Sequence, residues 1–218
     1  MIFGLIGDLD YFTKFWELEK HDNKDNPCYF CPCNLTSMNW RDFKPNASWV
    51  AATYTHEQWV ATHPGRLSFL MMSFISVFTL CTDWMHVKYL GSDQYFFGSI
   101  LSYMSFIMMD GATPQDNMET IMGFIRAYYR QHAVASYFKV ITVGMFTSKD
   151  SKKLRGRAAE IRHLAPALLH AFEIVVAYNL PHWSAEMKEF HLIISAALKL
   201  NIKLDQILDD NPGWHIRG

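Results

Sequence analysis

The sequence lacks an apolar run long enough to cross a bilayer, and it lacks the basic start of a secretory signal. Its most apolar stretch, residues 67–81, is about 15 residues long and includes three serines and a threonine, whereas a spanning helix needs roughly 20 apolar residues. The first residues carry Asp8 and Asp10 and no basic cluster, unlike a signal peptide. We therefore expect an intracellular chain without a membrane partner.

The chain also has little net charge and few cysteines. Its formal net charge of -1 gives no global argument for nucleic acid, membrane or acidic partners, so any such argument must rest on local charge. Three of the four cysteines lie within residues 28–33, and Cys81 stands apart. This spacing favours metal binding or plain thiols in a reducing compartment over a disulfide framework.

What the sequence does contain is enough apolar material for a real core. Of its 218 residues, 50% are hydrophobic and 15% are aromatic, which is ample for one folded domain. We predict a single domain over residues 1–218. Within it, residues 20–66 have little sustained periodicity and are predicted to form a loop-rich insertion, while residues 110–150 form a helical insertion.

Local patterns predict the elements of this domain. The apolar run IFGLIG predicts a buried strand that ends at Asp8, followed by a helix over about 10–19. The β-branched and aromatic runs at 74–80 and 139–146 predict further strands or extended segments. Apolar residues spaced by threes and fours predict longer helices over 84–109, 116–133, 153–178 and 184–209.

Three residues give the predicted 84–109 helix its particular features. Lys88 lies on the face opposite the apolar stripe, so we expect it to be exposed. Gly91 and Gly98 are the positions where we expect a bend or the close approach of a neighbour. In the 153–178 helix, Pro166 predicts a kink or a junction.

The cysteine-rich stretch, CYFCPC at 28–33, is a candidate metal site. The C-x2-C spacing of Cys28 and Cys31 lets two thiolates reach one tetrahedral Zn2+, and Cys33 follows directly. A second ligand pair is missing nearby. His21 is a candidate third ligand, and the distant candidates are His56, His63, His182 and His191. Zinc binding and free, partly buried thiols both stay open.

Asp83 and His86 stand three residues apart where the predicted 84–109 helix begins. Asp is a favoured N-cap residue, so Asp83 can simply bind the free N–H groups of the first turn while His86 packs along it. The alternative is a site that does chemistry. That alternative needs partners elsewhere in the chain, and the candidates are Asp8 and Glu160.

Glu160 lies in the most basic stretch of the chain. It can pair with Arg157 or His163 at helical spacing. Its surroundings suggest a second role, because residues 147–163 carry a net charge of +4. Carboxylates that hold Mg2+ or Mn2+ amid cations that hold a polyanion are typical of a phosphate-handling metal site.

The order of these motifs resembles a known family. GDLDYF, then CYFC, then DWMH, then RGRAAEIRHL resembles the RNase H-like catalytic core of eukaryotic cut-and-paste DNA transposases, most of all the Plavaka and KDZ-like groups. The D/C-x2-H motif is shared more widely, including by hAT elements. The resemblance covers about residues 4–175 at the level of pattern. It implies a partial α/β, RNase H-like core that is predominantly helical, with a small β-sheet and a zinc-bound insertion.

The resemblance also implies roles for individual residues. The catalytic residues would be Asp8, Asp83, His86 and Glu160, with Mg2+ or Mn2+ at the carboxylates. The zinc ligands would be Cys28, Cys31 and Cys33. DNA phosphates would contact Lys149, Lys152, Lys153, Arg155 and Arg157. The implied reaction is phosphodiester cleavage and strand transfer by a two-metal mechanism, in the nucleus, in a chain that can be a homo-oligomer.

Two assignments of the triad remain open. If Asp8 is the second aspartate of the family, the first is absent, and the chain is a fragment that is inactive alone. If Asp8 and Asp83 are the two aspartates, the triad is complete. A different hypothesis is a non-catalytic, transposase-derived module that binds DNA or protein through residues 147–163. A third is a helical enzyme or membrane-associated protein of another kind.

Overall fold

The structure is a computed structural model of residues 1–218. It describes all residues except 1–4, 8, 16–17, 19–22, 24, 43, 63–78, 149–150, 180–182 and 212–218. The sequence predicts one domain, whereas the chain clusters into two compact units, Met1–Val87 and Lys88–Gly218. Each unit is described by itself.

The first unit contains little regular structure. Its strands, β1 (Leu5–Gly7) and β2 (Leu80–Thr82), pair in parallel, with Ile6 opposite Cys81. Its helices are short: α1 (Leu9–Phe15), α2 (Ser48–Ala51) and α3 (His56–Thr62). Among its described residues, the buried apolar side chains include Phe12, Tyr29 and Trp59.

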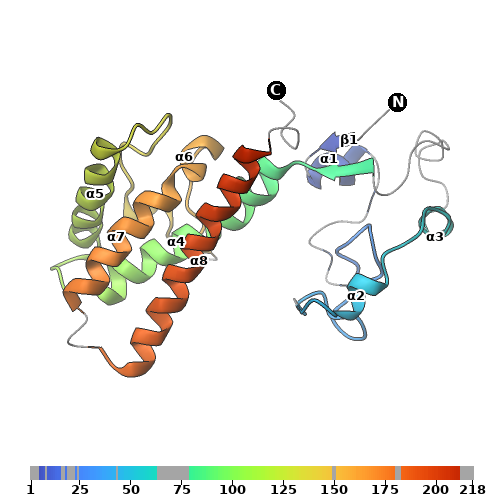
Figure 1. Ribbon diagram of the computed structural model, residues 1–218, viewed down its shortest axis with the longest axis horizontal. Coiled ribbons are helices and arrows are strands. Elements are labelled where there is room, and N and C mark those ends of the chain that lie inside the picture. Colours follow the sequence, from blue (N-terminus) through green and yellow to red (C-terminus); the bar gives the residue numbers. More distant parts are fainter. Residues whose placement is uncertain are drawn as a thin grey trace. The chain divides into compact units, whose positions relative to one another are not determined.

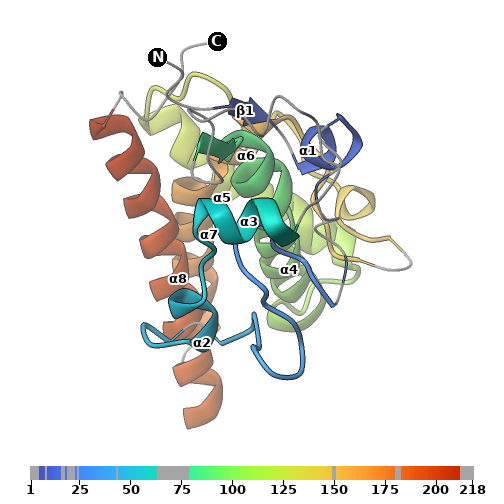
Figure 2. The same ribbon diagram turned by 90° about the vertical axis from the view of Figure 1, so that its right-hand side faces the viewer.

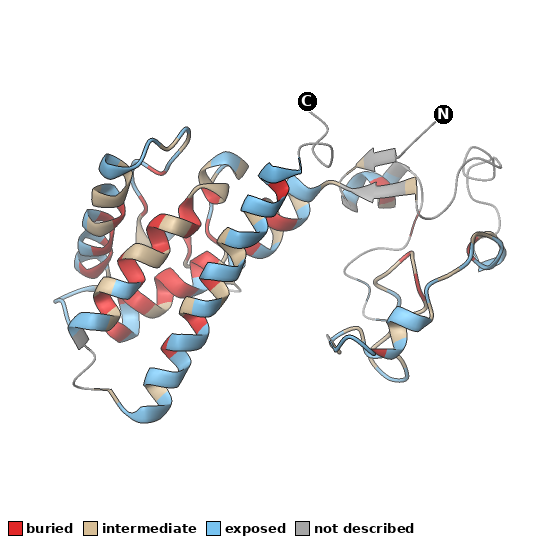
Figure 3. Cartoon of the chain, viewed as in Figure 1, coloured by how far each residue is buried: buried red, intermediate tan, exposed pale blue. Residues whose placement is uncertain are grey.

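The second unit is a helical bundle. It begins within the π-helical η3 (Met85–Ser92) and continues through α4 (Asp93–Tyr103), η4 (Met104–Met108) and α5 (Pro114–Gln131). A short 3-10 helix, η5 (Val143–Met145), follows. The last helices are α6 (Ala158–Arg162), α7 (Leu164–Asn179) and α8 (Ala185–Asp210). Helix α7 packs against both α5 and α8 (Figures 1 and 2). Figure 3 shows that the buried sides of α4, α5 and α7 face one another.

The sequence explains why these helices form and where they begin. Helix α5 buries Met118, Ile121, Met122 and Ile125, the spacing of one helical face. Its start is set by Thr113, whose side chain accepts a hydrogen bond from the Asp116 backbone N–H, followed by proline at the first helical position. The same capping by Ser184, which accepts from the Met187 N–H, begins α8.

The predicted α/β, RNase H-like fold class is wrong. Within the described residues, helices dominate, and the only sheet is the β1–β2 pair of three residues each. Residues 139–146 show one physical reason. They are predicted to form a strand or an extended segment, and the structure shows no strand there. Ile141 and Phe146 are buried in the helical core, and the stretch turns through η5 without a partner strand among the described residues.

Gly91 confirms the predicted bend in the 84–109 helix. Its backbone is non-helical, with φ −102° and ψ −105°, and it separates the first turns of η3 from α4. Lys88, by contrast, is buried rather than exposed, at 4% exposure. Within the described residues, no helix combines the length and apolar character that crossing a membrane requires.

Candidate functional site

The three clustered cysteines come together as the C-x2-C spacing predicts. The Sγ atoms of Cys28, Cys31 and Cys33 all lie within 4.8 Å of one another. Cys31 and Cys33 are buried and Cys28 is half-buried. The turn between them is fixed in part by the Phe30 backbone N–H, which donates to Cys28 Sγ at 3.3 Å. This arrangement could bind a metal such as zinc.

Burial sets the protonation of these thiols. Loss of solvation is the main cause that raises the pKa of all three above the ordinary thiol value. The thiols are therefore neutral at pH 7 when no metal is bound, and a metal would have to displace their protons. In the part of the chain that the structure describes, this is the only group of three or more metal-ligating side chains. The described residues therefore give no support for a Mg2+ site at carboxylates.

The histidines considered as further ligands do not join this cluster among the described residues. His56 stacks on Trp59 with ring centroids 6.4 Å apart. His191 belongs to the second unit, where its Nε2 lies 2.9 Å from the Tyr103 hydroxyl. His21, His63 and His182 lie outside the described residues.

Asp83 and His86 form the pair that their spacing suggests. Asp83 Oδ2 lies 2.7 Å from His86 Nδ1, and Asp83 Oδ1 accepts a hydrogen bond from the Met85 N–H at 2.9 Å. The Asp83 backbone N–H donates to the Gly7 carbonyl at 2.8 Å, directly after the β1–β2 pair. Asp83 thus caps η3 and also orients the imidazole through Nδ1. Asp8 lies outside the described residues.

Glu160 is held locally by Arg157. One carboxylate oxygen accepts from the Arg157 backbone N–H at 3.0 Å, and the other accepts from its guanidinium at 2.9 Å. These hydrogen bonds from Arg157 hold the pKa of the Glu160 carboxyl below its ordinary value. The first of these oxygens caps α6, and the second forms the local pairing with Arg157 that helical spacing predicts.

Residues 151–157, which we call the basic segment, correct the prediction of a helix over 153–178. The helices begin only at Ala158, and the junction falls at His163, before Pro166. The basic segment instead crosses α4. Its Leu154 N–H donates to the Gln94 carbonyl at 2.8 Å, and Leu154 is fully buried.

Gly98 makes this crossing possible. A Cβ at Gly98 would collide with the backbone carbonyl of Lys152, so only glycine lets the two backbones approach this closely. The predicted close approach at Gly98 is therefore confirmed. A second backbone bond, from the Arg155 N–H to the Met145 carbonyl at 2.9 Å, fixes the basic segment on its other side.

Three cations of the basic segment form no ion pair with a carboxylate that the structure describes. Lys152 Nζ lies 5.5 Å from the Phe106 ring centroid and Lys153 Nζ lies 5.4 Å from that of Tyr95. The Arg155 guanidinium donates to the Gly144 carbonyl at 2.7 Å. The side chains of Phe106 and Tyr95 are nearly half exposed. Arg157 is the exception because it pairs with Glu160, and Lys149 lies outside the described residues.

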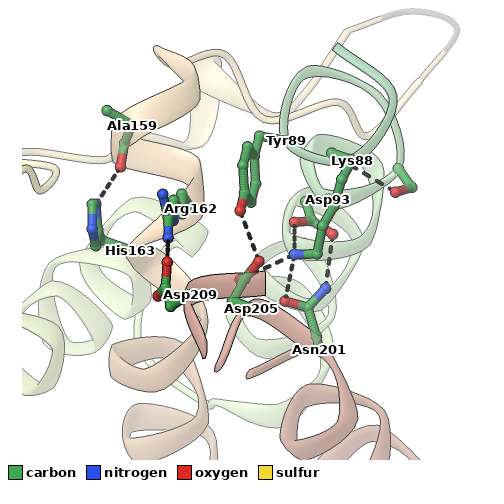
Figure 4. Close-up of polar contacts among 10 residues, drawn as sticks. Lys88, Tyr89, Asp93, Ala159, Arg162, His163, Asn201, Asp205 and Asp209 are labelled. Atoms are coloured by element: carbon green, nitrogen blue, oxygen red, sulfur yellow. Dashed lines mark hydrogen bonds and ion pairs between the residues drawn. The ribbon is translucent and has the colours of Figure 1, made fainter. Parts of the chain in front are cut away.

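Figure 4 shows a polar network around Lys88 that sequence reasoning missed. Lys88 Nζ donates to Asp93 Oδ2 at 2.6 Å, and to Asn201 and Asp205 oxygens at 3.1 Å each. The side-chain amide of Asn201 donates a hydrogen bond to Asp93, and the Tyr89 hydroxyl donates to Asp205, each at 2.8 Å. All three ammonium donors are therefore used, and the network joins α8 to η3 and α4.

This network has a structural role. Burial, together with the adjacent Asp205, raises the pKa of Tyr89 far above its ordinary value, so the phenol stays a donor. A second ion pair, between Arg162 and Asp209, joins α6 to α8. Two of the three partners of Lys88, Asn201 and Asp205, are more than 100 residues away in the chain, so no local spacing in the sequence could reveal them.

Comparisons with protein-family models, with curated proteins and with solved structures find no match for this chain. Among the described residues, the cysteine cluster and the basic segment are both candidate binding sites.

Proposed function

We propose that this chain is a non-catalytic DNA-binding module and that the basic segment contacts the phosphate backbone. The observation that carries the proposal is that Lys152, Lys153 and Arg155 have no carboxylate partner among the described residues. Backbone hydrogen bonds hold the segment that carries them against α4 and the η5 turn. Cations held in this way can neutralise phosphates without first breaking an ion pair.

The non-catalytic alternative is favoured over a transposase reaction. A two-metal reaction needs carboxylate oxygens free to bridge metals, and both oxygens of Glu160 already bind Arg157. Contacts of lysine and arginine with phosphates position a protein on DNA and do not read its sequence directly. We therefore propose binding with little sequence preference.

The test is DNA affinity at several salt concentrations, measured by fluorescence anisotropy with a labelled 20-base-pair duplex. The variant is the triple substitution Lys152→Ala, Lys153→Ala and Arg155→Ala. Its matched control removes three exposed lysines of α8, namely Lys188, Lys199 and Lys203. The plot of log affinity against log salt has a negative slope, and each lost phosphate contact should make it shallower by about 0.9. The slope of the variant should therefore be shallower by roughly two to three units.

The control should keep most of its affinity and slope. If both triple variants weaken binding equally, net charge and not the basic segment determines binding, and the proposal fails. Absence of duplex binding by the unaltered chain at low salt would refute it directly.

We also propose that Cys28, Cys31 and Cys33 hold Zn2+. The support is their geometry: Zn–S bonds of about 2.3 Å place tetrahedral thiolates roughly 3.8 Å apart, and the three Sγ atoms already lie within 4.8 Å. A fourth ligand would come from outside the described residues or from water. Such a site would fix the loops around residues 28–33.

Metal analysis of the purified chain tests the zinc proposal. We expect about one zinc per chain, lost in Cys31→Ser and kept in the control Thr36→Ala, whose side chain is exposed and close in sequence. Zinc content no higher in the unaltered chain than in Cys31→Ser would contradict it.

A further inference from the structure

A second cationic site lies between the C-terminal part of α5 and the loop that follows this helix. It is a cavity of about 490 Å³, lined by Arg126, Tyr129, Arg130, Tyr137, Phe138 and Lys139. Its volume is within the range of small-molecule sites, about 300–1,000 Å³. Three cations and three aromatic rings meet there, and none of them belongs to a motif that the sequence displays.

The three cations of this cavity have no carboxylate partner in the part of the chain that the structure describes. Arg126 and Arg130 stand four residues apart on α5 and therefore share a face. The Arg126 guanidinium donates to the Lys139 backbone carbonyl at 3.5 Å, which ties the following loop to the helix. Like charges at this spacing repel one another, and a bound anion would relieve that repulsion.

The helix dipole explains only one of these cations. Arg130 lies in the last turn of α5, where a positive charge is favoured by the carbonyl end of the helix. Arg126 lies a turn earlier, and Lys139 is in the loop. The hydrogen bond from Arg126 to the Lys139 carbonyl holds this loop on the helix, and Lys139 lines the same cavity as the two arginines.

The aromatic rings add a flat, apolar surface beside the cations. The Tyr129 and Tyr137 ring centroids are 4.9 Å apart, with an interplanar angle of 40°. Tyr137 is 44% exposed, so its ring is open to a ligand, whereas Phe138 is 3% exposed. Phe138 packs so closely on Gly156 that a Cβ there would collide with its ring. The cavity therefore borders the basic segment.

From this combination we infer that the cavity holds one nucleotide of single-stranded DNA. The base stacks on Tyr137, and the adjoining phosphate contacts Arg126, Arg130 and Lys139. A paired base in a duplex is already stacked and cannot enter, whereas an unpaired base can stack on an aromatic side chain. The inference rests on the proposed function and deepens it by naming single-stranded DNA as the preferred ligand.

The experiment compares three probes on the full chain: a labelled 15-nucleotide oligo-dT, the labelled 20-base-pair duplex, and thymidine monophosphate as a competitor. The main variant is Tyr137→Ala, with Tyr137→Phe as the substitution that keeps the ring. Tyr178→Ala is the matched control, because Tyr178 is 81% exposed on α7. A second variant, Arg126→Gln with Arg130→Gln, tests the phosphate contacts independently.

Loss of one stacked base should weaken oligo-dT binding by about 5- to 150-fold. We expect this loss in Tyr137→Ala, little change in Tyr137→Phe and Tyr178→Ala, and unchanged duplex binding in all three. The double arginine variant should weaken oligo-dT binding more than duplex binding. Thymidine monophosphate should compete only at far higher concentration than unlabelled oligo-dT.

The outcomes separate this inference from the proposed function. If duplex binding depends on the basic segment but oligo-dT binding is unchanged in both Tyr137→Ala and the double arginine variant, the inference fails and the proposed function stands. Competition by thymidine monophosphate as strong as that by oligo-dT would identify a free nucleotide as the ligand and overturn it. If neither DNA binds, both fail.

Discussion

Residues 25–62 and residues 88–211 are stabilised by different means. In the first range, side chains bind the backbone of their own loops: Asn34 Oδ1 accepts from the Thr36 and Ser37 N–H groups at 2.8 Å each. In the second, a continuous apolar core includes Leu101, Leu168 and Phe172, all fully buried. Small cores usually need a disulfide or a metal to be stable. In the first range, the cysteine cluster is a place where a metal could supply this stability.

Removal of the proposed zinc should have the largest effect, because it should destabilise the first range and not the second. Structural zinc contributes about 10–16 kcal/mol of apparent binding free energy in small zinc-finger peptides. We therefore expect a strong chelator to abolish amide-exchange protection around residues 28–59 and to leave α5 and α7 protected. Hydrogen exchange followed by mass spectrometry measures both. Equal loss of protection in α7 would show that the two ranges do not unfold separately.

A cavity in the helical core should have the next largest effect. Phe172→Ala removes a fully buried ring, and such changes cost about 3–5 kcal/mol. Urea unfolding followed by helical circular dichroism measures the loss. Phe106→Ala, at a ring 45% exposed, is the control and should cost far less. Similar losses in the two variants would contradict the placement of the core.

The Lys88 network tests whether buried charge also stabilises the bundle. Lys88→Met leaves Asp93 and Asp205 without their shared cation, and breaking such a buried pair costs about 3 kcal/mol. Adding Asp93→Asn removes one of the stranded charges, so the double variant should be less destabilised than the two single losses summed. A double-mutant cycle from urea midpoints measures this coupling; strictly additive losses would show that Lys88 and Asp93 do not interact.

The Glu160 cap should give the smallest effect and a defined pH dependence. Glu160→Gln should cost about 1 kcal/mol near pH 7, the usual loss for a helix cap. Because the pKa of the folded carboxyl is lowered, this stabilisation is complete above the unfolded pKa of about 4.3 and is lost as pH falls through the lower folded pKa. Unfolding curves of both proteins from pH 7 to pH 2 measure it. Glu119→Gln, at an exposed position of α5, is the control for the chemical change from glutamate to glutamine.

The sequence predicts the helices of the bundle well because their periodicity is local. The helix predicted over 184–209 is α8 at Ala185–Asp210, and that predicted over 116–133 is α5 at Pro114–Gln131. In both, a capping residue precedes an apolar stripe. A prediction that depends on a distant partner is less secure. Residues 139–146 are rich in β-branched side chains, but a strand also needs a neighbouring strand. The bundle supplies none within the described residues.

The same distinction applies to the candidate sites. The Cys28–Cys33 cluster and the Asp83–His86 pair depend on residues close in sequence, so spacing finds them. Lys88 is assigned to the polar face by periodicity, because nothing nearby in the sequence shows that Asn201 and Asp205 reach it. The cavity at Tyr137 is missed for a similar reason. The run Arg126–Arg130 is visible as a pair of cations with tyrosines between them, but Lys139 joins only through the path of the loop.

The crossing at Gly98 has a consequence for how this chain can change. The basic segment is held by its peptide hydrogen bonds, by the apolar Leu154 and by the Arg155 guanidinium on the Gly144 carbonyl. The side chains of Lys152 and Lys153 make none of these contacts. Substitutions at Lys152 and Lys153 can therefore alter its charge with little cost to folding, whereas almost any side chain at Gly98 would displace it. Mutational tolerance should thus be high at these two lysines and very low at this one glycine, so affinity for a polyanion could be tuned by evolution or design on an unchanged backbone.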